Sequence, residues 1–188
     1  MVRSRVTGSA LAASEAAIAC IIERGTLRVS ARELAGSAGI PERTFFRWFT
    51  TKEHVLQPVF DWGAEEFARV LAAHDGPPLE AIDAAFAAIL WGELEPRTRG
   101  IFPIAFADAQ GRAVFLAAMQ DGERHIRPAL AELLGLAPDG VEARAAAAGV
   151  AAAVRLALER LVATGEDPRP DFAALVRSQH AVVLAASG

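Results

Sequence analysis

Cysteine, tyrosine and long apolar runs are scarce or absent in this 188-residue sequence, which has one cysteine and no tyrosine. The single Cys20 can form neither an internal disulfide nor a cysteine cluster for a metal, a pattern typical of a reducing cytoplasm. Cys20 lies in an apolar run, so we interpret it as a core residue and not as a redox sensor. No stretch of about 18 uncharged apolar residues and no secretory segment occurs, so we expect a cytoplasmic protein without a membrane span.

Clusters of β-branched residues are also few, whereas hydrophobic residues make up 53% of the chain and alanine is abundant. This composition favours helices over sheets and predicts an all-α fold. Turn signals rich in Gly and Pro separate segments with helical apolar spacing. The predicted helices span residues 9–24, 31–37, 41–48, 51–73, 78–92, 97–108, 112–134, 139–164 and 171–186.

Basic residues are fewer than acidic ones, and the net charge is -4. Its distribution is uneven: residues 1–56 carry +3 and residues 57–188 carry -7. A basic head on an acidic body is expected where only the head approaches a phosphate backbone. We therefore predict a DNA-binding domain in residues 1–56 and a ligand-binding and dimerisation domain in residues 57–188.

The segment from Ser30 to Phe49 has the local signals of two short helices joined by a turn. Ser30 and Glu33 have the spacing of a capping box, which starts a helix. Gly39 can adopt the left-handed conformation that a sharp turn requires, and Pro41 is suited to the start of the next helix. This pattern predicts a helix-turn-helix.

The two helices and their turn share an apolar core, and the second helix has a polar outer face. The residues predicted to face the core of the motif are Leu34, Ala38, Ile40, Phe45 and Trp48. Arg43, Thr44 and Arg47 are left for the outer face, where Arg can read guanine and Thr can contact a base edge or a phosphate. A solvated helix with ordinary surface charges is the alternative. The capping box, the turn glycine and the apolar register together favour a recognition helix.

The same segment resembles the DNA-binding head of the tetracycline-repressor (TetR) family over roughly residues 9–56. The resemblance is carried by residues 29–35, 38–40, 43–49 and 52–53. It implies a three-helix head on a six-helix body, and an Ω-shaped homodimer whose heads reach successive major grooves of an inverted repeat. It also implies repression of transcription that a small molecule relieves. We expect neither a cofactor nor a metal.

The family's DNA contacts can be carried over position by position. The residues that the resemblance assigns to DNA binding are Ser30, Arg32, Arg43, Thr44, Phe46, Arg47 and Lys52. Phe46 stands where the family commonly has a tyrosine that binds phosphate, so Phe46 either contacts a sugar or a thymine methyl or makes no such contact. Pro41 stands where a capping Ser or Thr is frequent, which removes one further phosphate contact.

A second capping box, formed by Thr50 and Glu53, is expected to open the long helix that joins the head to the body. We expect this helix to act as a lever. Ligand binding in the body would shift it and change the separation of the two heads.

Aromatic and soft apolar side chains concentrate in three neighbouring helices of the body. The predicted ligand pocket is lined by Phe86, Leu90, Trp91, Phe102, Phe106, Phe115 and Met119. Such a pocket suits an apolar or aromatic effector, and simple core packing is the alternative. His125 has no partner at helical spacing that would complete a metal site, so we expect none.

The last two helices are predicted to pair two subunits in a four-helix interface. The small and apolar residues that form the predicted stripe are Ala143, Ala146, Ala147, Gly149, Val150, Ala153, Val154, Ala157, Leu158 and Leu161. The corresponding residues of the final helix are Phe172, Leu175, Val176, Gln179, Val182, Val183 and Ala186. The alternative is that these stripes complete the core of each subunit.

The function predicted from these features is sequence-specific, ligand-responsive regulation of transcription. An enzyme is a competing class, but the sequence has no Gly-rich phosphate loop, nucleophile elbow or zinc-protease motif, so we expect no catalytic activity. A helical adaptor that has lost DNA binding is a third class, which the missing tyrosine hydroxyl at position 46 keeps open.

Overall fold

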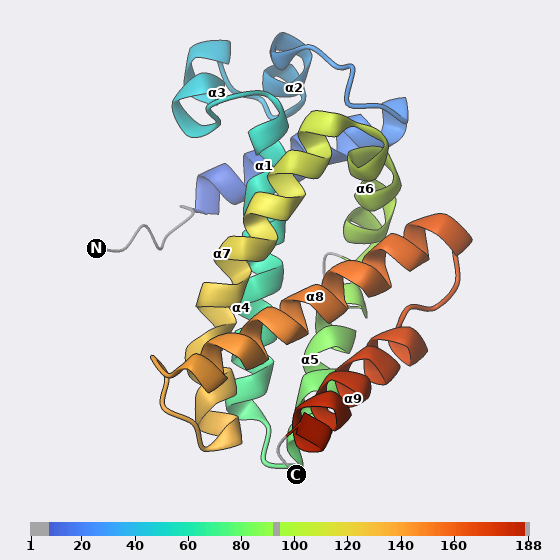
Figure 1. Ribbon diagram of the computed structural model, residues 1–188. Helices are drawn as coiled ribbons and strands as arrows, with labels where there is room; N and C mark the ends of the chain where they lie inside the picture. Colours follow the sequence, from blue (N-terminus) through green and yellow to red (C-terminus); the bar gives the residue numbers. More distant parts are fainter. Residues whose placement is uncertain (1–7, 92–94, 187–188) are drawn as a thin grey trace. The chain divides into compact units, whose positions relative to one another are not determined.

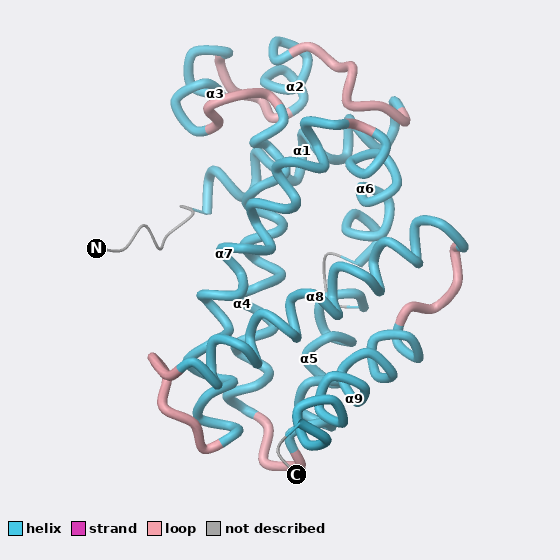
Figure 2. The backbone as a smooth tube through the Cα atoms, viewed as in Figure 1, coloured by secondary structure: helices cyan, strands magenta, loops and turns pink. Residues whose placement is uncertain are grey.

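The computed structural model describes residues 8–91 and 95–186, and the side chains of residues 10–90 and 99–179. Within these residues the chain is built from helices and loops without a strand (Figure 2), so the predicted all-α fold is confirmed. In chain order the helices are α1 (Gly8–Arg24), α2 (Ala31–Ser37), α3 (Glu42–Trp48), η1 (Glu53–Leu56, a 3-10 turn), α4 (Gln57–Ala73), α5 (Pro78–Trp91), α6 (Glu95–Ala107), α7 (Ala109–Leu134), α8 (Val141–Thr164) and α9 (Arg169–Ala186) (Figure 1).

The segment after α3 differs from its prediction. The long helix opens with the 3-10 turn η1, whose N-cap is Lys52 and has no side-chain cap. The predicted capping box of Thr50 and Glu53 is therefore wrong. The hydroxyl of the neighbouring Thr51 instead lies 2.9 Å from Nδ1 of His54. The ammonium group of Lys52 donates to the carbonyl oxygen of Leu27.

The described chain divides into two compact units, each formed from segments that are not contiguous. Unit 1 contains the described residues of Met1–Trp62 and Pro96–Ala118, and unit 2 contains those of Gly63–Glu95 and Met119–Gly188. Unit 1 therefore contains α1, α2, α3 and η1, together with the first part of α4, nearly all of α6 and the first part of α7.

The core of unit 1 holds a cluster of four phenylalanine rings. Phe60 of α4 stacks on Phe102 of α6 with the ring centroids 5.9 Å apart, and meets Phe115 of α7 edge-on at 5.5 Å. Phe106 of α6 lies 4.8 Å from Phe115. Each of these rings is at most 7% exposed, so the cluster excludes water and stabilises the packing of three helices.

Unit 1 also contains the buried polar side chain of Ser14 in α1. Its hydroxyl donates to the carbonyl oxygen of Val55 in η1 at 2.5 Å, which satisfies a polar group that would otherwise be costly to bury. This bond ties the first helix to the start of the long helix.

In unit 2, α9 packs against both α5 and α8. Phe86 of α5 and Phe172 of α9 stack with their centroids 3.9 Å apart. A Cβ on Gly149 of α8 would come within 2.6 Å of Oε1 of Gln179, and Gln179 donates to the Gly149 carbonyl at 3.0 Å. A side chain on Gly149 would thus force the Gln179 side chain to move and would disturb its bond to the Gly149 carbonyl.

No single helix among the described residues is long and apolar enough to cross a membrane. The segments Arg99–Ala107 and Ala109–Leu134 meet the criteria of length and composition only when they are taken together, and they are bent by 119° relative to each other.

Candidate nucleic-acid interface

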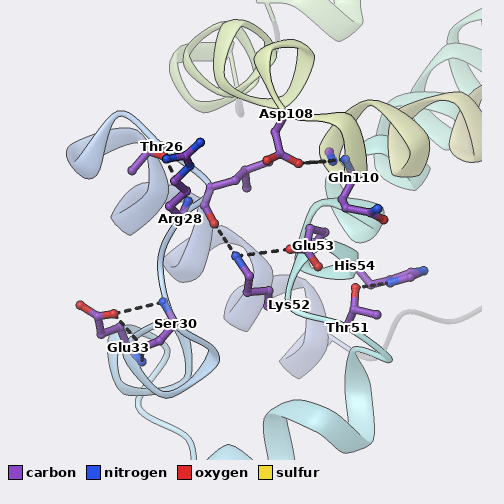
Figure 3. A network of polar contacts seen from close by, with 12 residues as sticks. Thr26, Arg28, Ser30, Glu33, Thr51, Lys52, Glu53, His54, Asp108 and Gln110 are labelled. Atoms are coloured by element: carbon purple, nitrogen blue, oxygen red, sulfur yellow. Dashed lines mark hydrogen bonds and ion pairs between the residues drawn. The ribbon is translucent and has the colours of Figure 1, made fainter.

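The first helix of the motif, α2, starts with the capping box that the sequence predicts. The Ser30 hydroxyl accepts from the Glu33 amide at 3.2 Å, and the Glu33 carboxylate accepts from the Ser30 amide at 3.1 Å and from its hydroxyl at 2.7 Å (Figure 3). These bonds from Ser30, helped by Arg24, lower the pKa of the Glu33 carboxyl against a small opposing effect of burial. The Ser30 hydroxyl remains exposed, but its proton is already donated to Glu33.

The turn between the two helices depends on Gly39, whose φ is +65°. The amide of Ile40 donates to the Ala35 carbonyl at 3.0 Å, which closes the end of α2. Pro41 is the N-cap of α3 and offers no side-chain hydrogen bond, while its carbonyl accepts from the amides of Thr44 and Phe45. The expected loss of a capping side chain at this position is confirmed.

The inner face of α3 is apolar. Phe45 is fully buried, Leu34 of α2 is 1% exposed, and Trp48, Ala38 and Ile40 are half-buried. Phe49 was not predicted for this face, but it is 2% exposed, and its ring centroid lies 4.9 Å from that of Phe45. Its spacing of four residues from Phe45 is the helical signal that indicates a shared face.

The outer face of α3 carries the predicted DNA-reading residues. Arg43 and Arg47 are exposed, Thr44 is half-buried, and Phe46 exposes 48% of its surface. Arg32 is exposed on α2. The guanidinium of Arg47 lies 6.0 Å from the centre of the Trp48 ring. Two arginines one helical turn apart, with an aromatic ring beside them, can contact base edges and sugars in a major groove.

Lys52 differs from these residues because its ammonium group already has partners within the protein. Its Nζ donates to the carbonyl oxygen of Leu27 at 2.5 Å and lies 3.3 Å from Oε1 of Glu53 (Figure 3). Burial raises the pKa of the Glu53 carboxyl, but hydrogen bonds from its own amide, Thr51 and Lys52 outweigh this effect and lower it. The carboxylate next to Lys52 is therefore held in its charged form.

The predicted pocket residues fall into the two units. Phe102, Phe106 and Phe115 are brought together in unit 1, where Phe60 joins them, a residue that the sequence analysis missed. Phe86 and Leu90 are buried in unit 2. Met119 is half-buried and also belongs to unit 2. The side chain of Trp91 lies outside the described residues.

Unit 2 has an open hollow of about 410 Å³. Its lining residues are Asp83, Phe86, Asp167, Arg169, Pro170, Phe172 and Ala173. Burial raises the pKa of the Asp83 carboxyl, and the charge of Arg177 reduces this shift. Arg169 is bound to the Asp167 carboxylate through two nitrogens, at 2.8 Å and 2.5 Å. Among the predicted pocket residues whose side chains are described, Phe86 alone lines this hollow.

The apolar stripe predicted for subunit pairing lies mostly inside unit 2. Its buried members are Ala143, Ala147, Val150, Ala153, Val154, Ala157, Leu158 and Leu161. The alternative interpretation, packing within one subunit, therefore holds for this face of α8. The last predicted residues of α9, Val182, Val183 and Ala186, have side chains outside the described part.

Within the described residues, α1, α2 and α3 form a helix-turn-helix unit, and α3 exposes Arg43 and Arg47 on its outer face, in a chain built of helices and loops. Residues 14–59 match the model of the bacterial regulatory proteins of the tetR family. No curated protein matches this sequence.

Solved structures share the fold across nearly the whole chain. The FadR repressor of Thermus thermophilus, a TetR-family protein in complex with lauroyl-CoA, is 23% identical over 89% of this chain and 91% of that chain, with a TM-score of 0.60. The fatty acid degradation regulator FadR of Bacillus halodurans is 14% identical, covering 93% and 95% of the two chains, also at 0.60. The SmeT–triclosan complex is 21% identical, covering 94% and 91%, at 0.59.

The head of the chain, residues 14–59, thus matches the TetR family in sequence, in agreement with the resemblance found there, and the chain as a whole shares its fold with TetR-family structures. Members of this family are transcription regulators and not enzymes.

Proposed function

We propose that the protein is a cytoplasmic repressor that binds an inverted-repeat operator as a homodimer and is released by a small apolar or aromatic effector. The observation that carries the DNA-binding part is the exposed face of α3, with Arg43, Phe46 and Arg47 outward. We assign DNA binding to residues 1–56, and ligand binding and dimerisation to residues 57–188.

Arg43 and Arg47 are four residues apart in α3, so both side chains leave the helix on the same side. Either can donate two parallel hydrogen bonds to guanine, and Thr44 beside them can contact a base edge or a phosphate. Arg32, at the start of α2, would add a contact to the DNA phosphates that sets the orientation on the duplex. Ser30 would do the same only by turning its hydroxyl from Glu33 to a phosphate.

The dimer surface that we propose is the outward face of α8, opposite its buried face. This stripe consists of the exposed Val141, Ala145, Ala148 and Leu156 and the half-buried Ala152. Val141 is 73% exposed and Leu156 is 39% exposed, and the small residues between them permit close approach of a second helix. Pairing of this face with its copy about a two-fold axis would bury the stripe.

The apolar and aromatic surface proposed for the effector is the phenylalanine cluster of unit 1. Its rings are at most 7% exposed, so an effector would have to displace packing within unit 1 to reach them. The complexes among the structural relatives contain lauroyl-CoA and stearoyl-CoA, which join an apolar acyl chain to a charged CoA, the aromatic triclosan, and imidazole. We therefore propose an effector with a fatty-acyl or aromatic part that contacts Phe60, Phe102, Phe106 or Phe115.

DNA binding is tested by selecting bound duplexes from a random pool with the full-length protein. We expect an inverted repeat, and loss of about 1–3 kcal/mol of binding free energy per half-site in Arg47→Ala. Arg124→Ala is the matched control, because Arg124 is an exposed arginine of unit 2. Enrichment of no sequence, or an Arg47→Ala variant that binds like wild type, would contradict the proposal.

Dimerisation is tested by light scattering at micromolar concentration. Leu156→Glu places a charge in the α8 stripe and should give a monomer, whereas Leu134→Glu, at a 37% exposed leucine of α7, should remain dimeric. A monomeric wild-type protein would contradict the dimer.

The effector proposal is tested with lauroyl-CoA and triclosan as probes. A true effector must weaken operator binding, and the operator must weaken binding of the effector by the same factor. If both probes leave operator affinity unchanged, the proposed effector class is wrong.

A further inference from the structure

Lys52 makes a long-range bond across the helix-turn-helix. Its Nζ donates at 2.5 Å to the carbonyl oxygen of Leu27, which lies 25 residues earlier in the loop between α1 and α2. The two residues flank the segment of residues 30–49 on either side. One charge-assisted bond therefore joins the chain that enters the motif to the chain that leaves it (Figure 3).

The Lys52 ammonium is placed for this internal role. Its side chain is only 33% exposed, and the Glu53 carboxylate is 3.3 Å away as a second acceptor. Two of the three ammonium donors are thus directed at protein oxygens. A phosphate at this position would compete with both of them for the charge.

Leu27 is held from a second side by the turn between α6 and α7. A Cβ on Gly111 would lie 2.6 Å from Cδ1 of Leu27 and 2.8 Å from the carbonyl oxygen of Ala105, so only glycine fits at this contact. Asp108 fixes the same turn, because its carboxylate accepts from the amides of Gln110 at 2.9 Å and of Gly111 at 3.0 Å. Leu27 itself is 5% exposed.

We propose that Lys52 is a positioning residue, which fixes α2 and α3 in the head by holding the Leu27 carbonyl, while the α6–α7 turn fixes Leu27 through its side chain. The functional consequence of this role rests on the proposed DNA binding, because a recognition helix must be held in a fixed position to dock in the major groove. It replaces the phosphate contact that the sequence predicts for Lys52.

The first test requires no DNA. Hydrogen exchange of the full-length protein should show the amides of residues 31–48 exchanging about tenfold faster in Lys52→Met, since a hydrogen bond of a charged group is lost. Lys52→Arg, which keeps a donor cation, should restore most of the protection. Arg28→Met, at an exposed arginine in the loop that contains Leu27, is the control and should exchange like wild type.

The second test separates positioning from phosphate binding by measuring the affinity for the selected operator against salt concentration. Loss of a phosphate contact lowers the slope of log K against log salt by about 0.9 for each contact. Loss of positioning lowers the affinity and leaves the slope unchanged, which is the result expected for Lys52→Met. Gly111→Ala, which alters no charge, should weaken binding in the same way by displacing Leu27.

Unchanged exchange in Lys52→Met, or a slope that falls by about 0.9 per subunit, would overturn the positioning role. If wild-type protein selects no operator, the proposed function fails, but the exchange experiment still decides whether Lys52 holds the head. If Lys52→Met does not fold, Lys52→Arg and Gly111→Ala carry the same comparison.

Discussion

Phe46 is the residue of the recognition helix whose chemistry departs most from what phosphate binding needs. Phe46 is 48% exposed and has no hydroxyl. The exposed ring can contact a sugar or a thymine methyl by apolar packing alone.

Adding the hydroxyl in Phe46→Tyr should therefore tighten operator binding by about 1 kcal/mol, the typical net contribution of one hydrogen bond. Fluorescence anisotropy with the selected operator measures the change. Phe46→Leu, which adds no donor, should not bind more tightly than wild type. A Tyr variant with unchanged affinity would mean that no phosphate lies within its reach.

Ser30 and Glu33 should make the stability of the head depend on pH. The pKa of Glu33 is lowered from 4.5 in the folded protein, chiefly by hydrogen bonds from Ser30. A lowered carboxyl pKa contributes stability above the unfolded value, and this contribution is lost as the pH falls through the folded value. Urea unfolding should therefore show that the advantage of wild type over Ser30→Ala shrinks on acidification below about pH 5. A difference that is independent of pH would contradict this role of the capping box.

At the scale of elements, the turn that ends α2 depends on Gly39, and Gly36 within α2 provides a control. Gly39 has a φ of +65°, whereas Gly36 has no such backbone requirement and a Cβ there would meet nothing within 4 Å. Gly39→Ala should lower the free energy of unfolding by about 1–2 kcal/mol because of left-handed strain. Gly36→Ala should raise it by about 0.5–1 kcal/mol through helix propensity. Denaturant unfolding of both variants measures this difference, and equal effects would show that the turn tolerates a side chain.

Local sequence signals predicted most elements because their causes lie within four residues. The capping box of α2, the turn at Gly39 and the buried face at Phe45 were all found in this way. The start of the long helix was not, because Thr50 has the spacing of a cap but the chain turns as a 3-10 segment there. The bond from Lys52 to Leu27 spans 25 residues, and no local pattern indicates it.

At the scale of the whole molecule, the net charge of -4 would repel DNA if it were spread evenly. Because residues 1–56 carry a positive balance, the proposed attraction to DNA would be restricted to the helices of this segment. This distribution, and not the total charge, is compatible with DNA binding.

The proposed dimer should couple stability to concentration, since association that occurs only in the folded state shifts unfolding by mass action. The melting temperature of wild type should rise as protein concentration increases, and that of Leu156→Glu should not. Differential scanning calorimetry over a hundredfold range of concentration, about 1–100 μM, is suitable. A wild-type melting temperature that is independent of concentration would argue against a folded dimer through α8.

The sequence alone determined the all-helical class, the bounds of most helices and the outward arginines of α3, because helical periodicity and capping act over a few residues. Tertiary structure decided which apolar face of α8 is buried. Most of the stripe predicted for pairing is buried against helices of the same subunit, and the stripe on the opposite face remains exposed. Tertiary structure also decided that Lys52 has internal partners and that Phe60 joins the aromatic cluster. Burial and long-range bonds depend on which helices meet, and a periodic pattern gives the face of a helix but not the neighbour that covers it.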